Sequence, residues 1–181
     1  MASILSIDTS GTCCSVALGL GSKRLVRRSD TPREHVRLVI PMVDAILAEA
    51  GVKLADLDAI AFTHGPGSFT GLRIGFGVVQ GLAFGADLPV IACSSLQVMS
   101  QRAIQREGIA CNSILVPAVD AHMGELYWGG YQQVNSIATP LASDGLCPQN
   151  EITLPIFEGI SPDISYIAVG DGWQYQPTLL R

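Results

Sequence analysis

Charged residues are scarce in this sequence, and basic residues are scarcer than acidic ones. Charged residues make up 15% of the 181 positions, with 11 Lys and Arg against 16 Asp and Glu, which gives a formal net charge of -5. Because affinity for a phosphate backbone comes mainly from Lys and Arg, this chain alone is not expected to bind a nucleic acid tightly. Hydrophobic residues make up 48%, so the chain can bury a sizeable core and is not of the disordered class.

The sequence also lacks cysteine pairs, a leader segment and an uninterrupted apolar run. Its five cysteines include no C-x-x-C pair, which favours reduced thiols and a cytoplasmic location. No basic segment followed by a long apolar stretch opens the chain, so no signal peptide is expected. The most apolar stretch, Gly71 to Ile91, contains Arg73, Gln80, Asp87 and Pro89, so no membrane span is expected.

The spacing of apolar residues predicts two α/β units, at residues 1–110 and 111–181, with the second shortened or truncated. The first unit has the predicted element order β-β-β-α-β-α-β-α. Its first helix is expected to be capped by Thr31 and to stop at Gly51. The remaining expected elements are helix Leu72–Phe84, strand Pro89–Ala92, a helix from Ser94 or Ser95 to about Arg106, and strands Ile114–Val119, Leu126–Tyr131 and Tyr166–Val169. Gln132 to Pro162 is rich in turn residues and only weakly periodic.

A glycine-rich segment, HGPGSFTGLRIG at residues 64–75, lies between a strand and a helix, where phosphate-binding loops occur. It contains no lysine and has the wrong glycine spacing for a Walker loop. Thr70 stands where the dinucleotide pattern needs its third glycine, and Pro66 stands where the serine-hydrolase elbow needs its first. Three common glycine-loop chemistries are therefore excluded.

An anion or nucleotide site remains possible where strands end and a helix begins. The acid and hydroxyls that end the first strand could hold Mg–phosphate, and the free N–H groups of the helix after the loop could hold an anion. A turn that satisfies its own backbone explains the same residues. The candidates for such a site are Asp8, Thr9, Ser10, Gly67, Ser68, Thr70, Gly170 and Gly172.

The helix after the loop contains too many glycines for an ordinary helix. Each glycine inside a helix costs about 1 kcal/mol relative to alanine, so a run of them needs compensation from close packing. A nearly all-apolar helix must also be covered on every side, and one sheet covers only one side. The alternatives are packing within the chain and a partner interface. The predicted interface residues are Gly71, Leu72, Ile74, Gly75, Val78, Gly81, Leu82 and Gly85.

No metal site is predicted, because the three histidines lack any ligand spacing such as H-E-x-x-H. A site built from Asp8, Asp120, His122 and Glu125 is conceivable but has no local signature.

Taken together, these motifs resemble the TsaB family of bacterial YeaZ-type proteins. The resemblance rests on Asp8-Thr9-Ser10, on the block from His64 to Gly75, on the block DAHMGELY at residues 120–127, and on Gly170-Asp171-Gly172, in that order. It covers nearly the whole chain, and the GPGSFTGLRIG block is its most specific part.

The resemblance implies an actin-like, Hsp70-type fold of two related lobes, the second reduced, with no catalysis by this chain alone. It implies pairing with a TsaD-like transferase, joined by a TsaE-like ATPase, to form threonylcarbamoyladenosine next to the anticodon of tRNAs that read codons beginning with A. It implies contact with tRNA only through the complex, a homodimer when alone, and no cofactor of its own, with ATP or ADP and Mg at the level of the complex.

The sequence departs from relatives in two places. The helix at Ser95–Arg106 has no histidine where TsaD-like relatives carry a metal-binding pair, which favours a non-catalytic partner. The first helix reads HVRLVIP where relatives usually have His-Ser-Glu. Two alternatives to the scaffold remain: an ATP-binding phosphotransferase or ATPase that uses Asp8, Thr9 and Gly170–Gly172, and a glycoprotease-like metallopeptidase, which the missing histidine pair disfavours.

Overall fold

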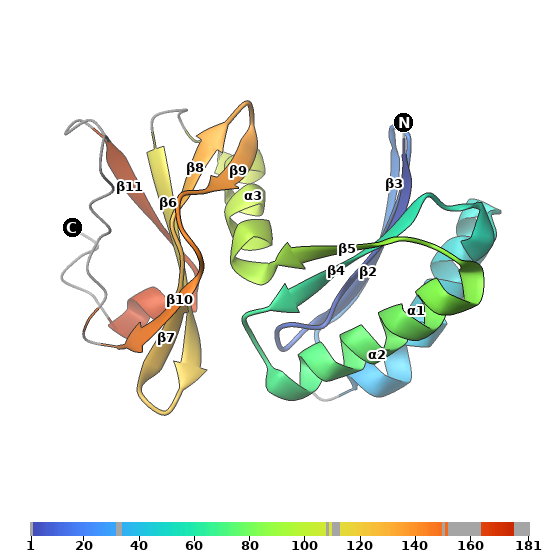
Figure 1. Cartoon of the computed structure of the whole chain (residues 1–181), viewed down its shortest axis with the longest axis horizontal. Helices are drawn as coiled ribbons and strands as arrows, with labels where there is room; N and C mark the ends of the chain where they lie inside the picture. Colours follow the sequence, from blue (N-terminus) through green and yellow to red (C-terminus); the bar gives the residue numbers. More distant parts are fainter. Residues whose placement is uncertain are drawn as a thin grey trace. The chain divides into compact units, whose positions relative to one another are not determined.

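A computed structural model of the chain describes residues 2–31, 34–107, 109, 113–149, 151 and 164–175. The chain divides into two compact units, Met1–Ser94 and Ser95–Arg181 (Figure 1). The sequence predicted a boundary at 110/111, after the third helix, whereas the contacts place that helix with the second unit.

The first unit contains a five-stranded mixed sheet in the order β3-β2-β1-β4-β5. The first three strands form an antiparallel meander, and β4 and β5 add to it in parallel. This order is the one expected for a lobe of the actin-like fold. The elements of this unit are β1 Ser3–Asp8, β2 Cys14–Leu20, β3 Lys23–Ser29, α1 His35–Ala50, η1 Leu54–Asp56, β4 Ala59–Gly65, α2 Phe69–Ala86 and β5 Val90–Ser94.

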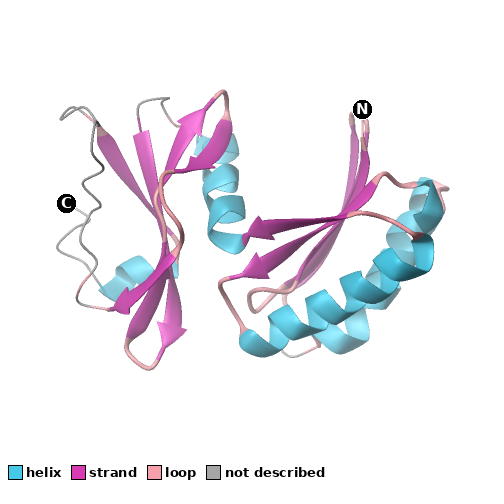
Figure 2. Ribbon diagram, in the orientation of Figure 1, coloured by secondary structure: helices cyan, strands magenta, loops and turns pink. Residues whose placement is uncertain are grey.

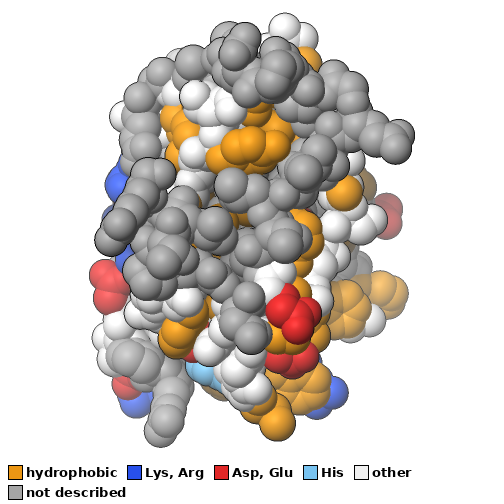
Figure 3. Space-filling model, turned by 90° about the vertical axis from the view of Figure 1, so that its left-hand side faces the viewer, with side chains coloured by type: hydrophobic (Ala, Val, Ile, Leu, Met, Phe, Trp, Pro, Cys, Tyr) orange, Lys and Arg blue, Asp and Glu red, His pale blue; other side chains and the backbone are white. Residues whose placement is uncertain are grey.

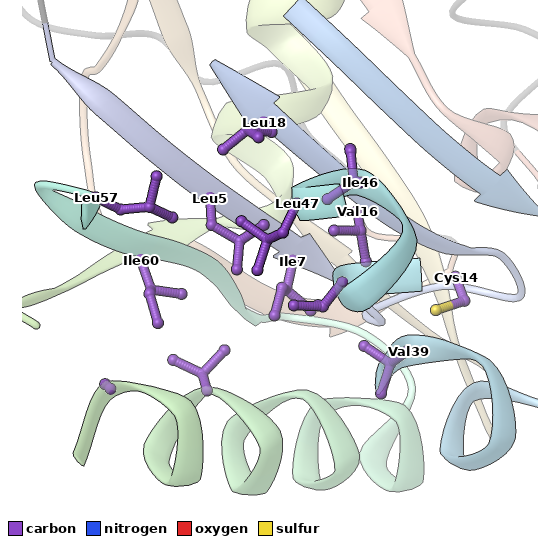
Figure 4. Packing of buried hydrophobic residues seen from close by; sticks show 13 residues of the cluster. Leu5, Ile7, Cys14, Val16, Leu18, Val39, Ile46, Leu47, Leu57 and Ile60 are labelled. Carbon is purple, nitrogen blue, oxygen red and sulfur yellow. The ribbon is translucent and has the colours of Figure 1, made fainter. Parts of the chain in front are cut away.

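Helices α1 and α2 lie side by side on one face of this sheet (Figures 1 and 2). The core forms between them and the inward side chains of the strands. Figure 4 shows Leu5, Ile7 and Ile60 from the sheet directed toward Val39 and Leu47 of α1 and toward α2. Alternation along the strands and helical spacing along α1 place these residues on the inner faces.

The structure confirms the predicted end of α1, but the predicted start of this helix is wrong. Gly51 adopts the left-handed conformation with φ of 70°, and its N–H donates to the carbonyl of Ala48. The helix begins at His35 and not after Thr31, because the Glu34 carbonyl accepts the first helical N–H bonds. Pro32, expected at the first helical position, lies outside the described residues.

The second unit is built around the long strand β6, which pairs with β7, β8 and β11. Helix α3 packs on this sheet, so the unit has fewer helices than the first among the described residues. Its elements are α3 Ser95–Glu107, β6 Ser113–His122, β7 Glu125–Trp128, β8 Tyr131–Val134, β9 Ile137–Pro140, β10 Gly145–Pro148, β11 Ser165–Val169 and η2 Asp171–Tyr175.

Two predictions for the second unit are wrong. The expected strand Leu126–Tyr131 is interrupted, because β7 pairs with the second half of β6 and β8 with its first half. Within Gln132–Pro162 the sequence analysis predicted no strand, yet β8, β9 and β10 occur there. These strands have four residues each, which is too short for a period of two to be distinct.

Candidate functional site

The carboxylate of Asp8, at the end of β1, accepts hydrogen bonds from neighbouring groups. One oxygen of Asp8, Oδ1, accepts hydrogen bonds from the Ser10 amide at 2.9 Å, the Ser10 hydroxyl at 2.7 Å and the Thr63 hydroxyl at 2.7 Å. This is the local turn bonding typical of Asp and Ser at strand ends. The three donors therefore hold this carboxylate oxygen in place as part of the turn.

The same turn fixes the beginning of α2. Thr9 is 1% exposed, and its hydroxyl donates to the carbonyl of Gly71 at 2.8 Å. The amide of Ser68 donates to the carbonyl of Ser10 at 2.7 Å. Ser68 also caps α2, since its hydroxyl accepts from the Gly71 amide at 3.2 Å. The turn at residues 8–10, considered above as a phosphate site, thus holds the first turn of α2 in position.

These contacts of Thr9 and Ser10 explain why three glycines of the loop and helix have no side chain. A Cβ at Gly67 would collide with the Ser10 carbonyl, one at Gly71 with the Thr9 carbonyl, and one at Gly75 with the Thr9 hydroxyl. These glycines follow one another at four-residue intervals, so they line the side of the loop and helix that faces Thr9 and Ser10. We call Gly67, Gly71 and Gly75 the inner glycine row. Thr9 and Ser10 occupy the space where side chains of this row would lie.

A second row of glycines on the same helix is open. Gly77, Gly81 and Gly85 also recur every four residues, and a Cβ added at any of them would meet nothing within 4 Å. All three lie on the exposed side of α2. We call them the outer glycine row. Nothing within the first unit accounts for their missing side chains.

Large apolar side chains flank the outer glycine row. Phe69, Phe76 and Phe84 are 68%, 56% and 90% exposed, and they lie along the same side of α2. Arg73 is the single charged residue of α2, and its guanidinium lies 3.9 Å from the centre of the Phe69 ring. Thr70 and Gln80 are exposed on the same side, so the surface is mainly but not wholly apolar. An exposed surface rich in large apolar side chains marks an interaction site.

Helix α1 extends this surface. Val36 and Ile40 are 66% and 40% exposed, and Pro41 and Ala45 are exposed beside them. Since α1 and α2 are neighbours over the sheet, their outward sides form one face (Figure 1). We call this the helical face, defined by Val36, Ile40, Phe69, Phe76, Gly77, Gly81, Phe84 and Gly85.

The structure places only two of the predicted interface residues on the helical face. Gly81 and Gly85 are exposed there, whereas Gly71 and Gly75 are buried against Thr9. Ile74, Val78 and Leu82 pack on the core of the first unit, and Leu72 is half-buried. Gly71 and Gly75 are therefore not accessible to a partner, whereas Leu72, Ile74, Val78 and Leu82 are only partly buried.

Sequence reasoning missed Phe69, Phe76, Gly77 and Phe84. A signal was present, since these residues and Gly81 share one helical stripe. The side was indicated by Thr70, Arg73 and Gln80, the polar residues of α2, which are exposed on it, but the sequence analysis treated the helix as nearly all-apolar and did not use them. By length and composition α2 could also cross a membrane, but Gly71, Gly75, Val79 and Ala83 are buried within the unit.

Gly170 and Gly172, which the sequence predicted for an anion or nucleotide site, pack closely against β6. A Cβ at Gly170 would collide with the Ala118 carbonyl, and Gly170 has φ of 99°. A Cβ at Gly172 would approach the same peptide group to 2.7 Å. Both glycines therefore let η2 pack directly on β6, where Trp173 donates to the Val116 carbonyl at 2.8 Å.

Asp120 is bound by neighbouring donors. Its Oδ1 accepts the His122 amide at 2.8 Å, and its Oδ2 accepts the Tyr175 hydroxyl at 3.0 Å. Hydrogen bonding by the His122 amide is the main cause that lowers the pKa of Asp120, and the same Tyr175–Asp120 bond raises the pKa of Tyr175. Across the described part of the chain, no group of three or more His, Cys, Asp or Glu is arranged to hold a metal.

Comparison with known proteins identifies relatives over nearly the whole chain. The family model described as TsaD, tRNA N6-adenosine threonylcarbamoyltransferase, matches residues 28–176. A tRNA threonylcarbamoyladenosine biosynthesis protein TsaB from Escherichia coli (strain K12) is 41% identical over 177 residues, which cover 97% of this chain and 74% of the relative.

Solved structures are also similar over nearly the whole chain. YeaZ from Pseudomonas aeruginosa matches with a TM-score of 0.89 and 40% identity, covering 98% of this chain and 79% of that one. A tRNA N6-adenosine threonylcarbamoyltransferase from Chromobacterium violaceum is 51% identical over a shorter stretch of 65 residues.

Proposed function

Since the chain belongs to the TsaB family of tRNA threonylcarbamoyladenosine biosynthesis proteins, we propose that it is a non-catalytic scaffold that activates a TsaD-type transferase. The product is threonylcarbamoyladenosine next to the anticodon of tRNAs that read codons beginning with A. The comparisons support this role in tRNA modification and give no support to a phosphotransferase or a metallopeptidase.

The helical face is the observation that carries the proposal. The inner glycine row shows what such a row does in this molecule, because the backbone of Thr9 and Ser10 lies directly against it. The outer glycine row has the same spacing and no occupant within the unit. A helix of a partner subunit fits there, with the phenylalanines packing along one side of the close backbone contact.

The contacts of Asp8 and Thr9 favour a structural role for this turn. A Mg–phosphate site at the end of β1 would need free carboxylate and hydroxyl groups in the turn. Here Oδ1 of Asp8 is held by three donors, and the Thr9 hydroxyl is committed to Gly71. The residues of this turn are therefore used to position α2.

Within the proposal, the partners are a TsaD-like transferase subunit at the helical face and a TsaE-like ATPase that joins the pair. Nucleotide and Mg act at the level of the complex, tRNA enters through the complex, and the setting is the cytoplasm. In the absence of the transferase, the apolar helical face pairs with that of a second copy, because a face of this kind is costly to leave in water.

The test is a partner-binding measurement on Gly81→Leu. The open space at Gly81 accepts a leucine without a clash inside the chain, so the fold should remain while the partner helix is held away. We expect the dissociation constant for the transferase subunit to rise by about tenfold or more, equivalent to about 1.4 kcal/mol. Gln105→Leu is the control, since it adds an exposed leucine to α3.

Reconstitution supplies the functional measurement. Purified chain, transferase, ATPase and tRNA are mixed, and modification is assayed with each component omitted in turn. The proposal requires that this chain alone gives no turnover and that its omission abolishes or strongly slows modification. Normal binding by Gly81→Leu would show that the helical face is not the interface.

A further inference from the structure

The basic residues of this chain are concentrated on one strand. The seven residues of β3, Lys23–Ser29, read KRLVRRS and include four of the 11 Lys and Arg of the whole chain. The strand contains no acidic residue, although acidic residues outnumber basic ones overall. The charge of the chain is thus distributed very unevenly.

These cations lie on a free edge of the sheet. β3 is the end strand of the first unit's sheet, and Lys23, Arg24, Arg27 and Arg28 are all exposed. Alternation directs Arg24 and Arg28 to one face of the sheet, and Lys23 and Arg27 to the other. From Lys23 to Arg28 the strand extends about 17 Å, so the cations form a ridge long enough to meet several backbone phosphates.

Two of the four cations have carboxylate partners. Arg27 pairs with Glu49 of α1, and Arg28 pairs with Asp30 at 2.6 Å, where Arg28 also donates to the Cys13 sulfur at 3.2 Å. Within the described part of the chain, neither Lys23 nor Arg24 forms an ion pair. These two residues, next to the β2–β3 turn, carry the uncompensated positive charge of the ridge.

Protection of the sheet edge against aggregation is the other explanation of the ridge, and the opposite edge of the sheet does not follow it. Charged residues on an edge strand prevent pairing with another chain. The opposite edge of the same sheet, β5, reads VIACS and has no charge at all, with Val90 and Ile91 44% and 43% exposed. This fold therefore does not protect its edges with charge as a rule. On the face shown in Figure 3, the described acidic and basic side chains are scattered.

We propose that the β3 ridge contacts the phosphate backbone of tRNA in the modification complex. This inference rests on the proposed function, which brings tRNA to the assembly. Arginine matches phosphate geometry with its planar fork, and lysine supplies a point charge. The contact is too small for the acidic chain to hold tRNA alone, and it adds to the affinity of the whole complex. In this proposal the protein partner meets α1 and α2, and tRNA meets β3.

The test uses the double variant Lys23→Gln and Arg24→Gln, which removes two charges without leaving a carboxylate unpaired. The double variant Arg102→Gln and Arg106→Gln on α3 is the matched control, because it changes the net charge equally at exposed positions. Each variant is assembled with the transferase and the ATPase. Binding of an unmodified tRNA transcript is then measured as a function of salt concentration.

We expect the β3 variant to reduce the magnitude of the slope of log affinity against log salt by about 1.5. The KM for tRNA should rise several-fold, with kcat and the affinity for the transferase unchanged. The control should leave the slope and KM at the wild-type values. An unchanged salt slope and KM in the β3 variant would overturn the inference even if wild-type modification proceeds normally. If the transferase and the ATPase modify tRNA equally well when this chain is omitted, the proposed function is overturned instead.

Discussion

The two glycine rows of α2 predict that one substitution has opposite effects at two positions of the same helix. At Gly81 a Cβ meets nothing within 4 Å, and the residue lies in the helix interior. Gly81→Ala should therefore raise the free energy of unfolding by about 0.8–1 kcal/mol, the difference in helix propensity. At Gly71 a Cβ would collide with the backbone carbonyl of Thr9, which cannot move without displacing β1.

Gly71→Ala should lower the free energy of unfolding by about 1–3 kcal/mol, the usual cost of overpacking a close contact. Displacing the turn would also lengthen the hydrogen bond from Thr9 to the Gly71 carbonyl. The gain from helix propensity is small at this position, because Gly71 lies in the first turn of α2.

Urea unfolding at fixed protein concentration measures both changes, with the first unit followed separately by hydrogen exchange of the β1 and β4 amides. The concentration must be held fixed because a self-associating face would add to apparent stability. If Gly71→Ala is neutral, the inner row is not filled as described. If Gly81→Ala is destabilising in the monomer, the outer row has a partner within the chain.

Three further predictions follow from the contacts of the first unit. Thr9→Val should lower the free energy of unfolding by about 1 kcal/mol, because it leaves the shape and removes the hydroxyl bonded to Gly71, and Thr9→Ser should retain most of the stability in the same urea assay. The amide and hydroxyl of Ser3 donate to Asp58 at 2.6 and 2.7 Å and hold the pKa of Asp58 below its ordinary value. This interaction stabilises the fold above about pH 4 and is lost as pH falls through the lowered pKa, so Ser3→Ala should raise the pKa of Asp58 in an NMR titration, and an unchanged value would contradict the assignment. Phe84→Ser should reduce self-association in sedimentation experiments with little loss of monomer stability, since the ring is 90% exposed, and unchanged association would exclude Phe84 from the contact.

Most of the first unit could be predicted because its elements are long and locally specified. The inward residues of α1 recur at helical spacing, and Gly51 ends the helix where a left-handed residue was expected. The second unit was less predictable. β8, β9 and β10 have four residues each. β8 and β10 are held by β6 and β7, respectively, which are not their neighbours in the chain, and β9 is held by β8 in a short hairpin.

The sequence by itself determined the composition of α2: a nearly uncharged helix with repeated glycines, which had to be packed closely on more than one side. It also supplied the blocks that indicate the family. The few polar residues of α2, Thr70, Arg73 and Gln80, share one side of the helix and so indicate the outward side. The sequence could not determine what the inward glycines pack against.

Only the tertiary structure decided what fills the inward side of the helix. The turn at Thr9 and Ser10 comes more than fifty residues before α2 in the chain, and it reaches the helix because β1 and β4 are neighbours in the sheet. Once Thr9 fills the inner row, helical geometry directs Gly77, Gly81, Gly85 and the three phenylalanines outward. The group that packs against the inner glycine row is thus set by a long-range contact with Thr9 and Ser10, which no local pattern of residues records.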